Sequence, residues 1–146
     1  MPNLKVDIVT AERVVLSEEG VDRLIVPGIE GELGVLPLHA PLLTTIKPGV
    51  LRVVKGEEET TMAITGGFIE VRENRVTILD DAAERGEEID VARVEAARRR
   101  AEELLASREA TVDVVKAEMA LKRALARLKA TEQVRRRRRG GAPPAG

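Results

Sequence analysis

The chain has 146 residues, with 24 basic and 25 acidic side chains, a single aromatic residue, one histidine and no cysteine. This length forms one domain, or one small domain with an appendage, and the composition excludes disulfide frameworks, thiolate catalysis, cysteine-bound zinc and any ordinary metal cluster. No apolar run approaches the roughly 18 residues that span a bilayer, and no signal peptide opens the chain, so we expect a soluble, cytoplasmic protein that binds no metal.

Residues 1–85 are predicted to form a β domain. Apolar and polar residues alternate over 4–8, the period of a half-buried strand, and short strands are also expected at 13–17, 21–26, 50–55, 60–65, 68–72 and 75–79. We expect a turn at Glu18–Gly20 and another at Asn74, whose side chain tolerates the left-handed backbone conformation. So many short strands indicate an antiparallel sandwich or barrel of about ten strands, with a core of Val, Ile and Leu.

The stretch 26–49 holds four glycines, four prolines and the only histidine among apolar residues, which indicates tight turns within a sheet. Its glycines do not follow a nucleotide-binding pattern. His39, among Pro and Leu residues, favours a structural or interface role over that of a base, and Glu30 and Glu32 favour contact with solvent or a partner over acid–base work. We therefore predict no catalytic residue in this chain.

An acidic bridge at 80–88 separates the β domain from a predicted helical hairpin at 86–134. Asp90 is expected to cap the first helix, whose apolar stripe is Val94, Ala97, Ala101 and Leu104. Thr111 is expected to cap the second, with the stripe Val114, Ala117, Leu121, Ala124 and Leu128. Because alanines bury little area, we expect an antiparallel hairpin that can detach. The Arg-rich tail, 135–146, is expected to be disordered.

The charge is divided unevenly between the two parts of the chain. Residues 1–85 carry nine basic and fifteen acidic side chains and residues 86–146 carry fifteen and ten, so the net charges are about −6 and +5. Antiparallel helices would bring Arg93, Arg100, Arg123 and Arg127 together to bind phosphate. The alternative is a solvated surface, because Glu95 with Arg99 and Glu118 with Lys122 have the spacing of ordinary helical ion pairs.

The run 27–42, PGIEGELGVLPLHAPL, followed by PGVLR at 48–52, closely resembles the amino-terminal domain of the epsilon subunit of rotary F-type ATP synthases, and the similarity extends from Leu4 to about Glu132. The resemblance implies a non-catalytic subunit at the foot of the central stalk, bound to the gamma subunit and the membrane c-ring. It implies a peripheral position on the cytoplasmic face of the bacterial plasma membrane, coupling of proton flow to ATP synthesis, and regulation of ATP hydrolysis by the hairpin.

The same resemblance implies three sets of functional residues. It places the loop with Glu30, Gly31 and Glu32 against the ring, and His39 near gamma. Residues 89–94 and 120–128 resemble the family's I/L-D-x-x-R-A and A-L-K-R-A-x-x-R-L motifs, which implies a regulatory ATP site, and no other cofactor, at Glu84, Asp90, Arg93, Arg100, Arg123 and Arg127. Val94 replaces the motif's alanine, and we expect it to weaken nucleotide binding.

The third set is a basic surface of the second helix, extended by the arginine run 135–139 and facing the catalytic alpha/beta subunits; it comprises Lys116, Lys122, Arg123, Arg127 and Lys129. A different class of function remains as an alternative. A nucleic-acid-binding adaptor would use the five arginines to displace counterions from phosphates. No aromatic platform accompanies them, because Phe68 is the only ring, so nucleic acid is not the expected partner.

Overall fold

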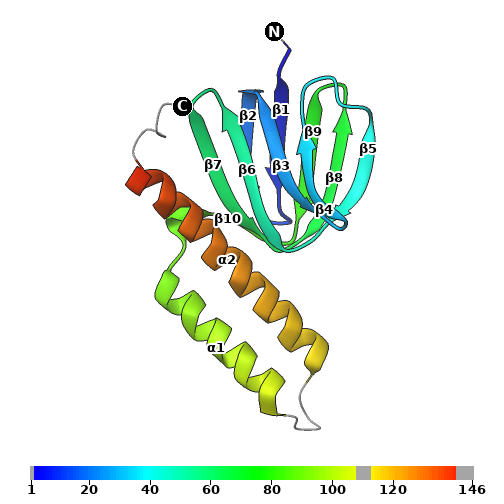
Figure 1. Cartoon of the computed structure of the whole chain (residues 1–146). Coiled ribbons are helices and arrows are strands. Elements are labelled where there is room, and N and C mark those ends of the chain that lie inside the picture. The colour runs from blue at the N-terminus through cyan, green and yellow to red at the C-terminus, as the bar shows by residue number, and fades with distance from the viewer. Residues whose placement is uncertain (1, 108–112, 141–146) are drawn as a thin grey trace.

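The computed structural model describes residues 2–107 and 113–140, which form a β-sandwich followed by two helices (Figure 1). The ten strands are β1 Leu4–Val9, β2 Val14–Val21, β3 Arg23–Gly28, β4 Gly31–Val35, β5 Leu42–Ile46, β6 Gly49–Lys55, β7 Glu58–Ile64, β8 Gly67–Arg72, β9 Arg75–Asp80 and β10 Ala83–Arg85. A short 3-10 helix, η1 (Gly86–Glu88), leads to α1 (Val91–Ser107) and α2 (Val114–Gly140). The predicted fold class is confirmed.

The strands pair in the order β10-β7-β6-β3-β5-β8-β9-β1-β2, and β4 pairs with β3. The prediction of a purely antiparallel sheet is wrong at one place, because β1 lies parallel to β9, from Lys5 opposite Arg75 to Val9 opposite Leu79. A parallel pair needs a long connection, and here the chain runs through all the intervening strands before β9 reaches β1.

The sandwich core is aliphatic, as predicted. Its buried side chains come from both layers and are Val, Ile and Leu except for Met62. Phe68 lies outside this core, with 54% of its surface exposed. Alternation places successive residues of a strand on opposite faces, and β8 follows this rule, with Ile69 and Val71 buried and Phe68 and Glu70 exposed.

One predicted turn is confirmed and one is wrong. Glu73 and Asn74, with φ of 50° and 62°, form the left-handed turn between β8 and β9. Glu18–Gly20 do not turn, because β2 continues through them. Val6 faces Glu18 while Leu4 faces Val21, so β2 carries one extra residue, and Gly20 (φ 70°) accommodates the resulting bulge.

The hairpin begins as predicted, since Asp90 Oδ1 accepts a hydrogen bond from Arg93 N at 3.3 Å. The predicted cap Thr111 lies outside the described residues, and Asp113 caps α2 by accepting a bond from Lys116 N at 3.0 Å. The expected disorder of 135–146 is wrong for 135–140, which continue α2, whereas 141–146 lie outside the described residues. Arginine has a high helix propensity, and extending an existing helix needs no new nucleus.

Candidate functional site

The hairpin meets the sandwich through a second, smaller apolar cluster. Helix α2 lies beside β6, β7 and η1 (Figure 1). The cluster consists of Val50 and Ala63 from the sandwich, Ile89 before α1, and Val94, Ala124 and Ala130 from the helices, with Leu128 at its margin. Alanine side chains bury little area, so this contact stabilises the docked hairpin only weakly for its length.

Two stripes of α2 are buried, and the sequence reasoning found only one of them. The predicted stripe includes the buried Ala117 and Ala124, but Val114 at its start is 52% exposed. The second stripe, Ala126, Ala130 and Val134, has a spacing of four residues and is 6%, 0% and 6% exposed. Val134 packs against the chain at Gly86, where an added Cβ would lie 2.8 Å from Val134 Cγ2. The four-residue spacing is the signal that could have revealed this stripe.

Two pairs of the predicted nucleotide-site residues are in contact. Arg127 donates hydrogen bonds through Nε and Nη2 to the Glu84 carboxylate, with 3.2 Å between Nη2 and Oε2, so a residue of β10 binds one of α2. Asp90 stands next to Arg93 as the cap of α1. The Glu84–Arg127 ion pair fastens the middle of α2 to the end of the sandwich.

The other three predicted arginines have no carboxylate partner among the described residues. Arg93 and Arg100 are exposed on α1 and Arg123 is half-buried on α2. Within the described residues, none of their guanidinium groups forms an ion pair or hydrogen bond with another side chain. The expected helical pair of Glu95 with Arg99 is also wrong, because Glu95 binds Arg98 at 2.7 Å.

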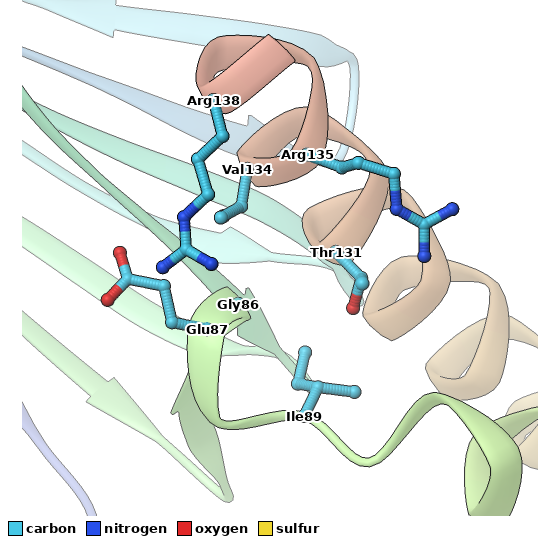
Figure 2. Close-up of a pocket in the computed structure, with 7 residues that line it drawn as sticks. All are labelled: Gly86, Glu87, Ile89, Thr131, Val134, Arg135 and Arg138. Carbon is cyan, nitrogen blue, oxygen red and sulfur yellow. The ribbon is translucent and has the colours of Figure 1, made fainter.

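A cavity of about 340 Å³ lies where the hairpin joins the sandwich, between η1 and the last turns of α2 (Figure 2). It is lined by Gly86, Glu87, Ile89, Thr131, Val134, Arg135 and Arg138. Figure 2 shows Glu87 and Arg138 pointing toward one another, whereas Arg135 points away from them. None of the six predicted nucleotide-site residues lines this cavity.

The predicted partner residues lie at the two ends of β4. Glu30 lies in the exposed turn between β3 and β4, and Gly31, which has a φ of 125°, is the first residue of β4. His39 lies in the connection from β4 to β5, and its Nδ1 is 2.7 Å from the Ala40 carbonyl oxygen. A five-residue strand is roughly 17 Å long, so the two sites are separate surfaces of the sandwich.

Beside His39, the Leu38 side chain is held out toward solvent. Leu38 has a φ of 68°, which is strained for a leucine, and 77% of its surface is exposed. Its backbone N donates a hydrogen bond to Asn74 Oδ1 at 2.6 Å, which holds the loop against the β8–β9 turn. Strain maintained by a specific contact at an exposed apolar residue is typical of a binding surface.

An exposed apolar row crosses the sheet on strands that α2 does not cover. Val14 faces Val9, Val9 faces Leu79, and Leu79 faces Phe68 across adjacent strands. Three of the four are more than half exposed, with Val14 at 58% and Phe68 and Leu79 at 54%. Leu43, at 70%, extends this surface on β5. Contiguous exposed apolar side chains mark protein interaction sites.

The predicted basic surface is divided by the docking of α2. Lys116, Lys122 and Lys129 are exposed, whereas Arg127 is paired with Glu84. Lys122 and Lys129 line a groove of about 630 Å³ between α2 and the sandwich, together with Glu32 of β4. Glu32 of β4 and the basic face of α2 therefore border one groove.

Asp80 is a buried carboxylate that was not predicted from the sequence. Its side chain is 5% exposed at the end of β9. Oδ1 accepts hydrogen bonds from Thr65 N and Oγ1 and from Ala82 N, while Oδ2 is buried without a partner. Burial raises the pKa of Asp80 to about 6, against the lowering effect of those hydrogen bonds. Asp80 thus fixes the chain just before it leaves the sandwich for the hairpin.

No cluster of three or more potential metal ligands occurs in the part of the chain that the structure describes. No helix among these residues is long and apolar enough to cross a membrane. A sandwich with an exposed apolar face, joined to a weakly docked helical hairpin, defines a subunit that acts through its surfaces within a larger assembly.

Comparison with known proteins identifies that assembly. Residues 3–86 match the family model of the ATP synthase Delta/Epsilon chain beta-sandwich domain, and residues 87–132 match that of the Delta/Epsilon chain long alpha-helix domain. The chain therefore belongs to the ATP synthase delta/epsilon chain family, and the predicted family is confirmed. It is a non-catalytic subunit of the ATP synthase.

Individual relatives agree with this assignment over most of their length. The chain is 50% identical over 128 residues to the ATP synthase epsilon chain of Desulforamulus reducens, covering 88% of this chain and 96% of the relative. It is 52% identical over 134 residues to that of Herpetosiphon aurantiacus, covering 92% and 98%. These matches favour the ATP synthase prediction over a nucleic-acid adaptor.

Solved structures give the same result. A chain in the Euglena gracilis mitochondrial ATP synthase, solved as OSCP/F1/c-ring in rotational state 1, matches with a TM-score of 0.78 and 26% identity over 90% of this chain and 81% of that one. A chain in the central stalk and c-ring structure of the Tetrahymena thermophila mitochondrial enzyme has a TM-score of 0.61 at 16% identity, which supports the fold alone.

Proposed function

We propose that this subunit forms the foot of the central stalk, where it joins the gamma subunit to the membrane c-ring, and that its hairpin restrains ATP hydrolysis. In this role it couples proton flow to ATP synthesis while lying peripherally on the cytoplasmic face of the bacterial membrane. The observation that carries the proposal is the separation of surfaces: an acidic turn and a strained apolar loop at opposite ends of β4, with the hairpin docked on other strands.

Gamma is the partner that the apolar surface fits. The exposed row of Phe68 and Leu79 on β8 and β9 offers the rigid apolar contact that a permanent rotor interface requires. Leu38, beside His39, adds an exposed apolar side chain at the other end of these two strands, where its backbone N is bonded to Asn74. We expect Leu38→Asp to reduce co-purification with gamma at least tenfold, since it places a charge in the interface. Glu12→Gln, an exposed change in the β1–β2 connection, is the control. Equal recovery of gamma with both variants would contradict this placement.

The ring is the partner proposed for the turn with Glu30 and Gly31. Glu32 lies in the groove beside Lys122 and Lys129, whereas Glu30 does not line that groove, so Glu30 is the more accessible probe. Glu30→Cys and Glu32→Cys should cross-link to ring subunits in membranes, with the higher yield at Glu30. Absence of both cross-links in an intact complex would show that this loop contacts something else.

The restraining element is the basic face of α2. In the docked hairpin, the Glu84–Arg127 ion pair and the sandwich groove occupy part of this face, so undocking would release Arg127 and move Lys122 and Lys129 away from the groove, where they could contact an acidic segment of the catalytic subunits. Deleting residues 88–146 should therefore raise ATP hydrolysis by the assembled enzyme without preventing assembly. Unchanged hydrolysis at low and high ATP would rule out a braking role.

ATP is proposed as the regulatory ligand that favours the docked hairpin. A ligand shifts a conformational equilibrium only by its differential affinity for the two states, so Arg93→Ala should weaken ATP binding and ATP-induced compaction together. Arg99→Ala is the matched control, since it removes an exposed arginine of the same helix that lies outside the proposed site. Calorimetric titration that shows no ATP binding by the unmodified chain would remove ATP from the proposal and leave the brake intact.

A further inference from the structure

The last turns of α2 lie beyond the residues that match the family's helical domain. The match to that domain ends at residue 132, whereas α2 continues to Gly140. Within this extension, Val134 is buried against Gly86, and Arg137 reaches the start of β7. The extension therefore adds both an apolar and a charged contact between hairpin and sandwich.

The charged contact is specific in its geometry. Arg137 Nη1 lies 2.5 Å from the Glu59 carbonyl oxygen and 2.8 Å from Glu59 Oε2, so one guanidinium engages both the backbone and the side chain of one residue. The side chains of Arg137 and Glu59 are 32% and 21% exposed. Arg52 Nη1, from the neighbouring strand β6, lies 3.4 Å from Glu59 Oε1 and holds the carboxylate in place. A half-buried, hydrogen-bonded pair contributes more than an exposed one.

The neighbouring arginines behave differently. Arg136 binds Glu132 at 2.7 Å, one turn earlier on the same helix, and its side chain is 76% exposed. Arg138 lies beside the cavity with Glu87 in Figure 2. Among the described side chains of the arginine run, only Arg137 forms an ion pair with the sandwich. The run is thus not a uniform basic tail.

We propose that residues 133–138 form a latch that holds the hairpin against the sandwich, with the Arg137–Glu59 pair as its ionic element and Val134 as its apolar element. Because the remaining seam is rich in alanine, the latch sets a large share of the docking equilibrium, and the ionic part makes that equilibrium depend on salt. By holding the hairpin docked, the tail would act against the inhibition of ATP hydrolysis by the undocked hairpin. Its removal favours undocking, which would lower ATP hydrolysis by the assembled enzyme, the opposite of what a purely basic braking tail predicts.

The inference rests on the proposed hairpin movement. Docking is measured in the isolated full-length chain, so the test stays valid even if the hairpin does not inhibit ATP hydrolysis in the assembled enzyme. The chain contains no cysteine, which allows unique spin labels at Glu12→Cys on the sandwich and Glu118→Cys on α2. Pulsed dipolar spectroscopy then measures the populations with docked and undocked distances. Arg136→Ala is the matched control, since it removes an equal charge from the adjacent position without touching the sandwich.

At about 0.05 M salt, Arg137→Ala should raise the ratio of undocked to docked molecules roughly fivefold, and Arg136→Ala should leave it unchanged. Glu59→Gln should have a smaller effect, because the carbonyl oxygen still accepts from Arg137. Exchanging the charges, Arg137→Glu with Glu59→Arg, should restore part of the docking. At about 1 M salt the parent should approach Arg137→Ala. Equal distance distributions for Arg137→Ala and Arg136→Ala at both salt concentrations would overturn the latch.

Discussion

Truncating Val94 to alanine tests how the hairpin is held against the sandwich. The family motif and the structure lead to opposite expectations for this variant. The family motif has alanine at this position, from which we expect tighter nucleotide binding by Val94→Ala. In the structure, however, the Val94 side chain is 0% exposed within the cluster that joins helix and sandwich. Removing it therefore leaves a void at the docking interface.

The magnitude follows from burial. Val→Ala removes two carbon atoms, which at about 0.8 kcal/mol each is about 1.6 kcal/mol of transfer free energy. Incomplete collapse of the void adds to this, giving roughly 2 kcal/mol in total. Since Val94 contacts the hairpin seam and not the main sandwich core, the loss should appear as undocking of α1 and α2. A loss of this size corresponds to a roughly 30-fold increase in the undocked population.

Native-state hydrogen exchange measures this population residue by residue. Amides of α1 and α2 in Val94→Ala should exchange roughly 30-fold faster, while those of β8 and β9 keep the parent's rates. Val115→Ala is the control, because Val115 is 70% exposed on α2. Equal acceleration in the helices and the sandwich would refute the reasoning, since it would mean that the hairpin and sandwich open as one unit. Unchanged helix exchange would mean that Val94 contributes nothing to docking.

Two further predictions concern the sandwich. The folded pKa of Asp80 is raised from 3.8 to about 6, so its protonated form is favoured by folding; the associated stability is fully present below about pH 4 and is lost as pH rises to about 6, by up to about 3 kcal/mol. Asp80→Asn should flatten this part of the pH profile in urea titrations, and an unchanged profile would assign the dependence to other groups. Gly67→Ala should destabilise the fold by more than about 3 kcal/mol, because its Cβ would lie 1.9 Å from the Leu79 carbonyl oxygen. Gly34→Ala, which meets no atom within 4 Å, should be nearly neutral in the same melts.

Local patterns were sufficient to predict the elements. Alternation at Leu4, Val6 and Ile8 has the period of a strand, and the stripe through Val94 and Ala101 has the period of a helix, so each element reveals its buried face without its neighbours. Asp90 and Asn74 were predicted for the same reason, because a cap and a left-handed turn depend on a few consecutive residues. The family resemblance in 27–42 was equally local.

Pairings between distant segments were decided only by the tertiary structure. The parallel contact of β1 with β9 and the bulge at Gly20 depend on which strand lies beside which, and no local period encodes that. Asp80 gave no signal because an Asp-Asp pair in a polar bridge has the composition of a linker. Its burial follows from its hydrogen bonds to Thr65 and Ala82.

The arginine run shows most clearly where sequence reasoning stops. Composition alone predicted a disordered basic tail, because five consecutive arginines have no apolar face to bury. Yet Glu59, 78 positions away in sequence, accepts two hydrogen bonds from Arg137 and fixes the last turns of α2 on the sandwich. The free energy that orders this segment comes from a contact across the fold, so only the arrangement of α2 beside β7 distinguishes Arg137 from the arginines on either side of it.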